Sequence, residues 1–240
     1  MILKEEKLFF LHVPKTGGTT IEHFLCDLYN RHIRDLTIFT NGFVAKTSYS
    51  GLNTIWETIC HITYKDQLKM AKNSSIIIDN TWNIFTIVRN PYYRAISAIF
   101  YQRYLGCHYG MHTLPTLIEK RKLFTQAYTT FFTTDPLKNN WWQHRLPQHL
   151  MVETHPLDNS PFCKIYKYEE GLENILKQAL HLNTIPSLQS HHSAEQNRIP
   201  KTNYKDLFTR GFIESVNEFY AKDFEVFNYD MLNPLDYPED

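Results

Sequence analysis

The chain has 240 residues, of which 42% are hydrophobic and 15% aromatic, and its 25 basic side chains balance its 25 acidic ones. This size and composition favour one globular domain over residues 1–240, and the lack of a basic excess argues against a nucleic-acid binder. An anionic ligand would therefore have to meet a local basic groove, because the net charge supplies no global field.

Apolar periodicity and turn residues predict strands that alternate with helices along the chain. In chain order we expect a strand at 7–13, a helix at 18–30, strands at 36–40 and 55–62, a helix at 63–72, and strands at 75–79 and 83–88. Helices at 91–104 and 114–130, a strand at 163–168, a helix at 172–182 and further helices within 203–222 follow. This alternation predicts an α/β fold with a central, mostly parallel sheet flanked by helices.

The turn between the first strand and the first helix has the composition of an anion-binding loop. It carries these residues: Pro14, Lys15, Thr16, Gly17, Gly18, Thr19 and Thr20. Glycines allow close backbone approach, lysine adds a positive charge, and the N–H groups at a helix start favour an anion. It is not a Walker A loop, because its lysine precedes the glycines, and the Rossmann glycine spacing is also absent.

A second motif follows the strand at 83–88. Arg89 stands at the carboxyl end of that strand, where open α/β sheets place ligands, and Pro91 fits the first turn of the next helix. Ser97 lies eight residues after Arg89. An arginine and a serine placed in this way can hold one terminal phosphate.

Residues 13–20 resemble the 5′-phosphosulfate loop of sulfotransferases that use 3′-phosphoadenosine 5′-phosphosulfate (PAPS), and residues 89–97 resemble the 3′-phosphate motif of the same family. The likeness is to the carbohydrate branch, which includes heparan sulfate 2-O-sulfotransferase. Weaker similarities at residues 145–148, 164–169 and 219–229 extend the resemblance over nearly the whole chain. It implies a P-loop-like sulfotransferase fold, with PAPS as donor, PAP as product and no metal.

The resemblance also implies roles for individual residues. Lys15 would stabilise the leaving oxygen, and His61, in a segment that resembles the one carrying the family's base, would deprotonate the acceptor hydroxyl. His12 is the chief alternative base. The late polar stretch would close over the nucleotide through Arg198, Lys201 and Thr202.

The acceptor is the least specified partner. We expect a glycan or another hydroxyl-bearing molecule, with Glu57, Arg145 and Gln148 as candidates for contacting it. Two alternatives stay open: a catalytically silent protein that binds a nucleotide or glycan, and an ATP-dependent phosphotransferase. A metal site built from the local histidine pairs is disfavoured, because the spacing does not supply four zinc ligands.

Localisation follows from what the sequence lacks. There is no signal peptide and no apolar run long enough to span a bilayer, and the four cysteines form no close pair. We therefore expect reduced thiols and a cytoplasmic protein of microbial or viral origin, unless the sequence is a trimmed portion of a longer one.

Overall fold

The computed structural model of the chain describes residues 1–30, 63–73, 75–101, 114, 116–134, 144–152, 163–186, 188 and 203–240. The chain divides into two compact units. The first comprises Met1–Val88 with Gln148–His191, and the second comprises Arg89–Pro147 with His192–Asp240. Each unit has a hydrophobic core of its own. The single domain over residues 1–240 stays a prediction.

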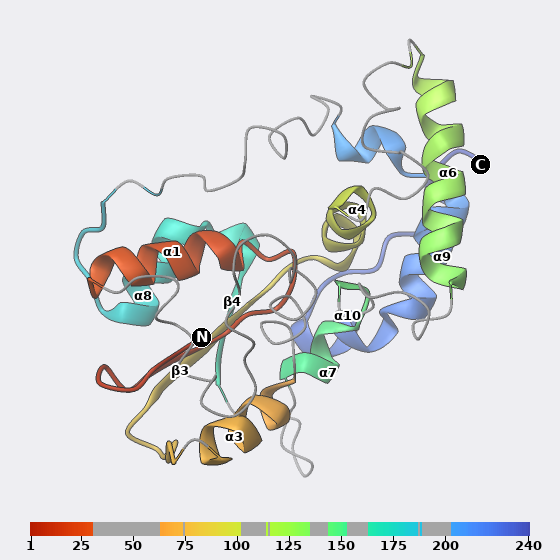
Figure 1. The fold of residues 1–240 in the computed structure, drawn as a ribbon. Coiled ribbons are helices and arrows are strands. Elements are labelled where there is room, and N and C mark those ends of the chain that lie inside the picture. The colour runs from red at the N-terminus through yellow and green to blue at the C-terminus, as the bar shows by residue number, and fades with distance from the viewer. Residues whose placement is uncertain are drawn as a thin grey trace, which may run out of the picture. The chain divides into compact units, whose positions relative to one another are not determined.

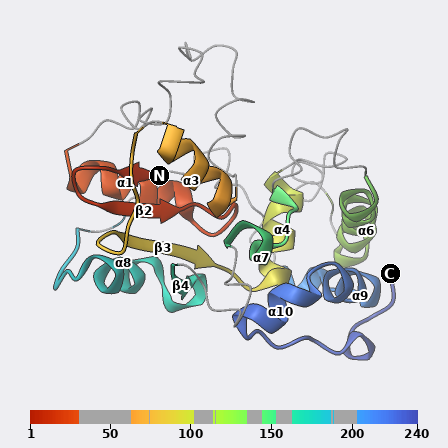
Figure 2. The same cartoon turned by 90° about the horizontal axis from the view of Figure 1, so that it is seen from below.

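The first unit contains a four-stranded sheet in the order β1-β2-β3-β4 (Figure 1). Its strands are β1 (Ile2–Leu3), β2 (Leu8–Leu11), β3 (Asn83–Val88) and β4 (Lys164–Lys167). β1 pairs with β2 in antiparallel fashion, whereas β2, β3 and β4 are parallel, and Figure 2 shows β2 and β3 side by side. The sheet is therefore mostly parallel, as the alternation of strands and helices predicts.

Successive residues of a strand point to opposite faces of the sheet, so apolar side chains lie on both faces. Helices cover both of them. Phe10 and its register partner Phe85 pack against α1 (Gly18–Leu28) and α8 (Leu172–Leu180). Phe9, on the opposite face, stacks on Tyr64 of α3 (Tyr64–Asn73), with ring centroids 5.6 Å apart. The first unit also holds α7 (Gln148–Val152) and the short turn η5 (Tyr168–Glu170).

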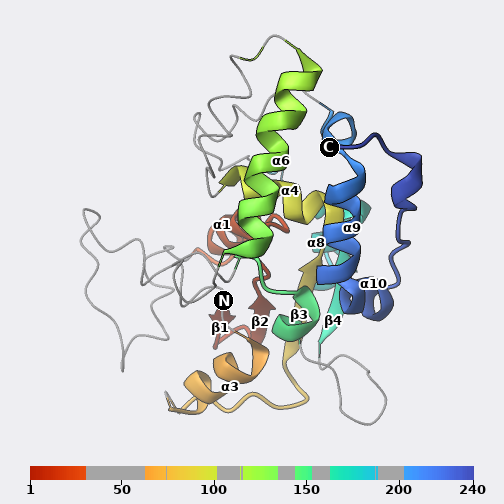
Figure 3. The same cartoon turned by 90° about the vertical axis from the view of Figure 1, so that its right-hand side faces the viewer.

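The second unit is helical, and aromatic side chains fill its core. It contains α4 (Pro91–Tyr101), α6 (Leu117–Thr133), η7 (Tyr204–Leu207), α9 (Arg210–Phe219), α10 (Ala221–Phe227) and η8 (Pro234–Asp236). Figure 3 shows α6 and α9 side by side. Phe124 and Phe212 meet edge to face between these two helices, with centroids 5.1 Å apart, a geometry that adds stability beyond burial.

A buried arginine caps the C-terminal end of α6. The Nη1 of Arg145 donates hydrogen bonds to the carbonyls of Phe131 (2.6 Å) and Thr134 (2.7 Å), and the hydroxyl of Tyr220 donates to the Arg145 carbonyl (2.9 Å). The last carbonyls of a helix lack partners within the helix, and a cation there complements its dipole. Arg145 therefore joins the end of α6 to α9 through Tyr220, the residue that directly follows α9.

The observed elements confirm most of the predicted ones. β3 matches the strand at 83–88, and α1, α3, α4, α6, α8 and β4 fall within three residues of expectation wherever the structure describes both ends. The strand at 75–79 is wrong. Ser75 has a positive φ of 57°, and the N–H of Ile76 bonds back to Ala71, so the segment is the exit turn of α3. The strands at 36–40 and 55–62 lie outside the described residues.

The contacts of Arg145 generate a stability prediction. Arg145→Ala should lower the free energy of unfolding by about 2 kcal/mol or more, because two helix-end carbonyls lose a charged donor in a buried place. Urea denaturation followed by circular dichroism measures this. Arg121→Ala is the matched control, since its Nε donates to one carbonyl, that of Asp206, in an exposed bond. Equal, small losses in both variants would contradict the structural role of Arg145.

Candidate functional site

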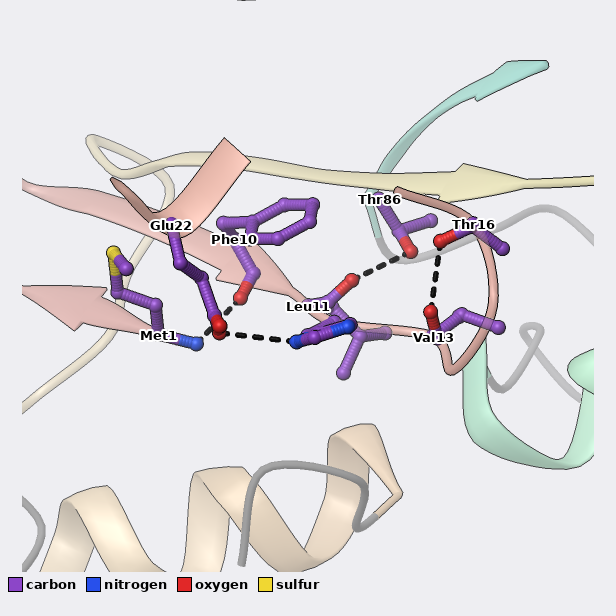
Figure 4. A network of polar contacts seen from close by, with 8 residues as sticks. Met1, Phe10, Leu11, Val13, Thr16, Glu22 and Thr86 are labelled. Atoms are coloured by element: carbon purple, nitrogen blue, oxygen red, sulfur yellow. Dashed lines mark hydrogen bonds and ion pairs between the residues drawn. The ribbon is translucent and has the colours of Figure 1, made fainter. Parts of the chain in front are cut away.

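Two buried hydroxyl groups hold the loop from β2 to α1 in place (Figure 4). The hydroxyl of Thr86, on β3, donates to the carbonyl of Leu11 (2.8 Å), where β2 ends. The hydroxyl of Thr16 donates to the carbonyl of Val13 (2.7 Å), within the loop itself. The Thr16 proton is therefore used inside the loop, and what Thr16 can offer an anion is its backbone N–H.

Two loop residues adopt left-handed backbone conformations. Lys15 has a φ of 69° and Gly17 a φ of 83°. For glycine this costs nothing, whereas for lysine it costs on the order of 1 kcal/mol. A Cβ on Gly17 would lie 2.9 Å from Cδ1 of Leu172, so a side chain there would require the end of the Leu172 side chain, on α8, to move. Strain retained at a lysine in a tight loop is typical of a functional site.

The first turn of α1 presents backbone donors to the loop. The N–H groups of Gly18, Thr19 and Thr20 have no acceptor within the helix, by the geometry of any helix start. No acidic residue stands in this turn, and Gly17 supplies no side-chain cap. No carboxylate of the first turn therefore offsets the positive end of the helix, which suits an anion with several oxygens.

A buried histidine packs against this turn and contacts a buried glutamate of the same helix. His12 follows β2 directly and is 5% exposed, and its Nδ1 lies 3.1 Å from Oε1 of Glu22 on α1. A Cβ on Gly18 would lie 2.0 Å from Cδ2 and 2.1 Å from Nε2 of His12. Gly18 is thus required by the packing of the imidazole ring against the start of α1.

Several groups act on the carboxyl of Glu22. Burial raises its pKa, but the charge and hydrogen bond of His12, together with the amino group of Met1 and the side chain of His23, outweigh burial and hold the pKa below its usual value. The Met1 nitrogen also donates to the Phe10 carbonyl (2.6 Å; Figure 4). Glu22 is therefore ionised near neutral pH.

The second motif begins where β3 ends. Arg89 comes directly after Val88 and is half-buried, and the side chain of Asn90 accepts a hydrogen bond from the N–H of Tyr92 (3.0 Å) at the start of α4. No acidic residue stands in the first turn of α4. Ser97 is half-buried on the same helix. Arg89 and Ser97 belong to the second unit, and the loop before α1 belongs to the first.

Other predicted site residues divide into two groups. His61, Glu57, Arg198, Lys201 and Thr202 lie outside the described residues, and their roles stay predictions.

Arg145 (8% exposed) and Gln148 (0% exposed) are both inside the protein, and the contacts described for Arg145 are those that close α6. Contact of either residue with an acceptor also stays a prediction.

Glu22 is the residue that sequence reasoning missed. The available signal was an acidic residue on the buried side of α1, beside Ile21 and Leu25.

Two kinds of feature are absent from the described part of the chain. Within it, no cluster of three or more histidine, cysteine, aspartate or glutamate side chains is arranged to hold a metal ion. No helix in the same residues combines the length and apolar character that crossing a membrane requires.

The lowered pKa of Glu22 predicts how stability depends on acid. A carboxyl with a lowered folded-state pKa stabilises the fold above its ordinary value of 4.5, and this contribution is lost as pH falls through the folded-state value. Glu22→Gln removes that titration, so its unfolding free energy should fall less than that of the wild type between about pH 5 and pH 3.

Urea denaturation at several pH values measures this difference. The control is Glu218→Gln, at an exposed position of α9, which should keep the acid dependence of the wild type. An identical acid dependence in Glu22→Gln would contradict the effect assigned to His12.

Comparison with known proteins places the chain in a family. Comparisons with curated proteins and with solved structures found no match. A family model described as the sulfotransferase family matches residues 1–230, a range that contains both motifs. The α/β architecture with its mostly parallel sheet agrees with the sulfotransferase fold. Because the match covers nearly the whole chain, this protein belongs to the sulfotransferase family.

Proposed function

We propose that this protein transfers the sulfuryl group of PAPS to a hydroxyl of an acceptor, with a carbohydrate as the acceptor class. Membership of the sulfotransferase family supports sulfuryl transfer and a hydroxyl-bearing acceptor. The observation that carries the donor assignment is the loop before α1, where a strained Lys15 precedes a helix start without acidic residues. Backbone donors and a mobile cation in one turn suit a phosphosulfate group.

The donor would be held at two ends. The N–H groups of the first turn of α1 bind the 5′ phosphosulfate, and Arg89 with Ser97 binds the 3′-phosphate. β2 and β3 are neighbouring parallel strands, and each motif follows the carboxyl end of one of them. Ligands of open α/β sheets bind at such ends. The late residues Arg198, Lys201 and Thr202 close over the nucleotide.

The chemistry needs a base, an in-line approach and charge stabilisation. His61 removes the proton of the acceptor hydroxyl, whose oxygen forms a new bond to sulfur. The bond between sulfur and the bridging oxygen breaks, and PAP leaves with the electron pair. Lys15 places its positive charge near that bridging oxygen. The products are a sulfate ester and PAP.

The surroundings of His12 favour His61 as the base. The Nδ1 of His12 faces Glu22, its Cδ2 and Nε2 lie against Gly18, and the residue is 5% exposed. An acceptor hydroxyl would have to reach a ring whose edges are packed against α1. A general base must come within hydrogen-bond reach of the proton it removes.

The 3′-phosphate assignment predicts a binding defect. Arg89→Ala should weaken PAP binding by about 2–5 kcal/mol, because the phosphate loses a charged donor. Isothermal titration calorimetry with PAP measures the affinity, and ATP and NADP serve as comparison ligands. Arg121→Ala, on α6, removes the same charge and should bind PAP like the wild type. Unchanged affinity in Arg89→Ala would contradict the assigned phosphate site.

The base assignment predicts a catalytic defect without a binding defect. His61→Ala should lower kcat by about 10²–10⁴-fold while PAP affinity stays within about twofold of the wild type. Transfer from labelled PAPS to a panel of glycans measures turnover, and the panel also identifies the acceptor. His181→Asn is the control, because His181 is exposed and has a φ of 55°, a conformation that asparagine tolerates.

Turnover of His61→Ala close to that of the wild type would remove His61 from the base role. Wild-type protein that binds PAP but sulfates no member of the panel would favour the catalytically silent alternative.

A further inference from the structure

The imidazole of His12 is enclosed on several sides where β2 gives way to the loop. Its ring is nearly parallel to that of Phe10, with an interplanar angle of 22° and centroids 5.9 Å apart. Its Nδ1 lies 3.1 Å from Oε1 of Glu22. The Nδ1 edge of the ring therefore faces the carboxylate of Glu22 at close range. The ring orientation of His12 is thereby set by Glu22.

Helix α1 meets this ring at two places on one face. Gly18 and Glu22 are four residues apart, so they lie one above the other on the helix. Gly18 leaves the space that the ring edge occupies, since a Cβ there would lie 2.1 Å from Nε2. Glu22 supplies the carboxylate. Two contacts on one face fix both the position and the rotation of the first turns of α1 against the end of β2.

We propose that His12 and Glu22 are positioning residues for the donor, acting through the first turn of α1. They hold the N–H groups of Gly18, Thr19 and Thr20 at the place where the 5′ phosphosulfate binds, and they do not touch the donor. This inference rests on the proposed function. A displacement of about 1 Å in such donors is enough to cost a binding site much of its strength, so a rigid support has a measurable effect.

The role predicts which end of the nucleotide is affected. His12→Ala and Glu22→Ala should each weaken PAP binding by about tenfold, and the double variant should lose no more than about twofold beyond either single one. Affinity for adenosine 3′-phosphate, which lacks the 5′ group, should stay within about twofold of the wild type. Calorimetry with both ligands measures the two effects on the same samples.

His12→Asn is the conservative variant, because its amide nitrogen takes the place of Nδ1 and can still donate to Glu22. It should recover most of the PAP affinity that His12→Ala loses. The controls are Glu218→Ala and His181→Asn, at exposed positions of α9 and at the end of α8. Circular dichroism and thermal denaturation establish that each variant is folded at the titration temperature.

The outcomes separate this inference from the proposed function. Wild-type protein without PAP binding would overturn both. PAP binding by the wild type together with unchanged affinity in His12→Ala and Glu22→Ala would overturn the positioning role alone. Equal losses for PAP and adenosine 3′-phosphate would also overturn it, since they would show general loosening. If His12→Ala does not fold, Glu22→Gln replaces it, and a loss of about threefold for PAP alone is then expected.

Discussion

The backbone path from the end of β2 to the start of α1 is the constraint on which the proposed chemistry depends. Within residues 12–17 the chain must leave a buried strand, turn, and begin a helix whose first N–H groups have no acceptor within the helix. The path needs positive φ values at Lys15 and Gly17. The hydroxyl of Thr16 donates a hydrogen bond to the Val13 carbonyl, which holds the turn. Thr86 adds a hydrogen bond from the neighbouring strand. An anion site made of backbone donors is only as well defined as this path.

The charges at helix starts single out the same place. Among the described helices of nine residues or more, α3, α6 and α8 carry Asp66, Glu119 and Glu173 in their first turns. α9 has no such residue, but the carboxylate of Asp240 accepts a hydrogen bond from its N-cap, Thr209 (2.5 Å). α1 and α4 lack an acidic residue of their own in the first turn, and they are the helices that follow the two motifs. A chain with no net charge can thus offer positive potential locally. It does so at the N-terminal ends of α1 and α4, where no acidic side chain of the first turn offsets the helix dipole.

Local patterns made the sheet and the two motifs predictable, because strand, turn and helix signals lie within a few residues of one another. The strand at 83–88 and the start of α1 at Gly18 show this. The segment at 75–79 shows the limit. Its three isoleucines, 76–78, are apolar and β-branched, yet Ile77 is 81% exposed, since no strand of the described sheet pairs with it. The roles of Glu22 and Arg145 depend on partners that only folding brings near. Composition could not distinguish an arginine that closes a helix from one that contacts an acceptor.

The pairing of Glu22 with His12 also answers a difficulty that a buried carboxylate creates beneath an anion site. A lone negative charge one turn inside α1 would oppose the field that its first N–H groups offer a phosphosulfate. His12, the Met1 amino group and His23 all act to lower the pKa of Glu22, so they offset its charge where it stands. Apolar side chains of the same volume would give comparable stability, because a buried pair returns little net energy. What they would not give is a close polar contact between His12 at the end of β2 and Glu22 on α1. An anion site built from backbone N–H groups depends on the rotation of α1 that this contact helps to set.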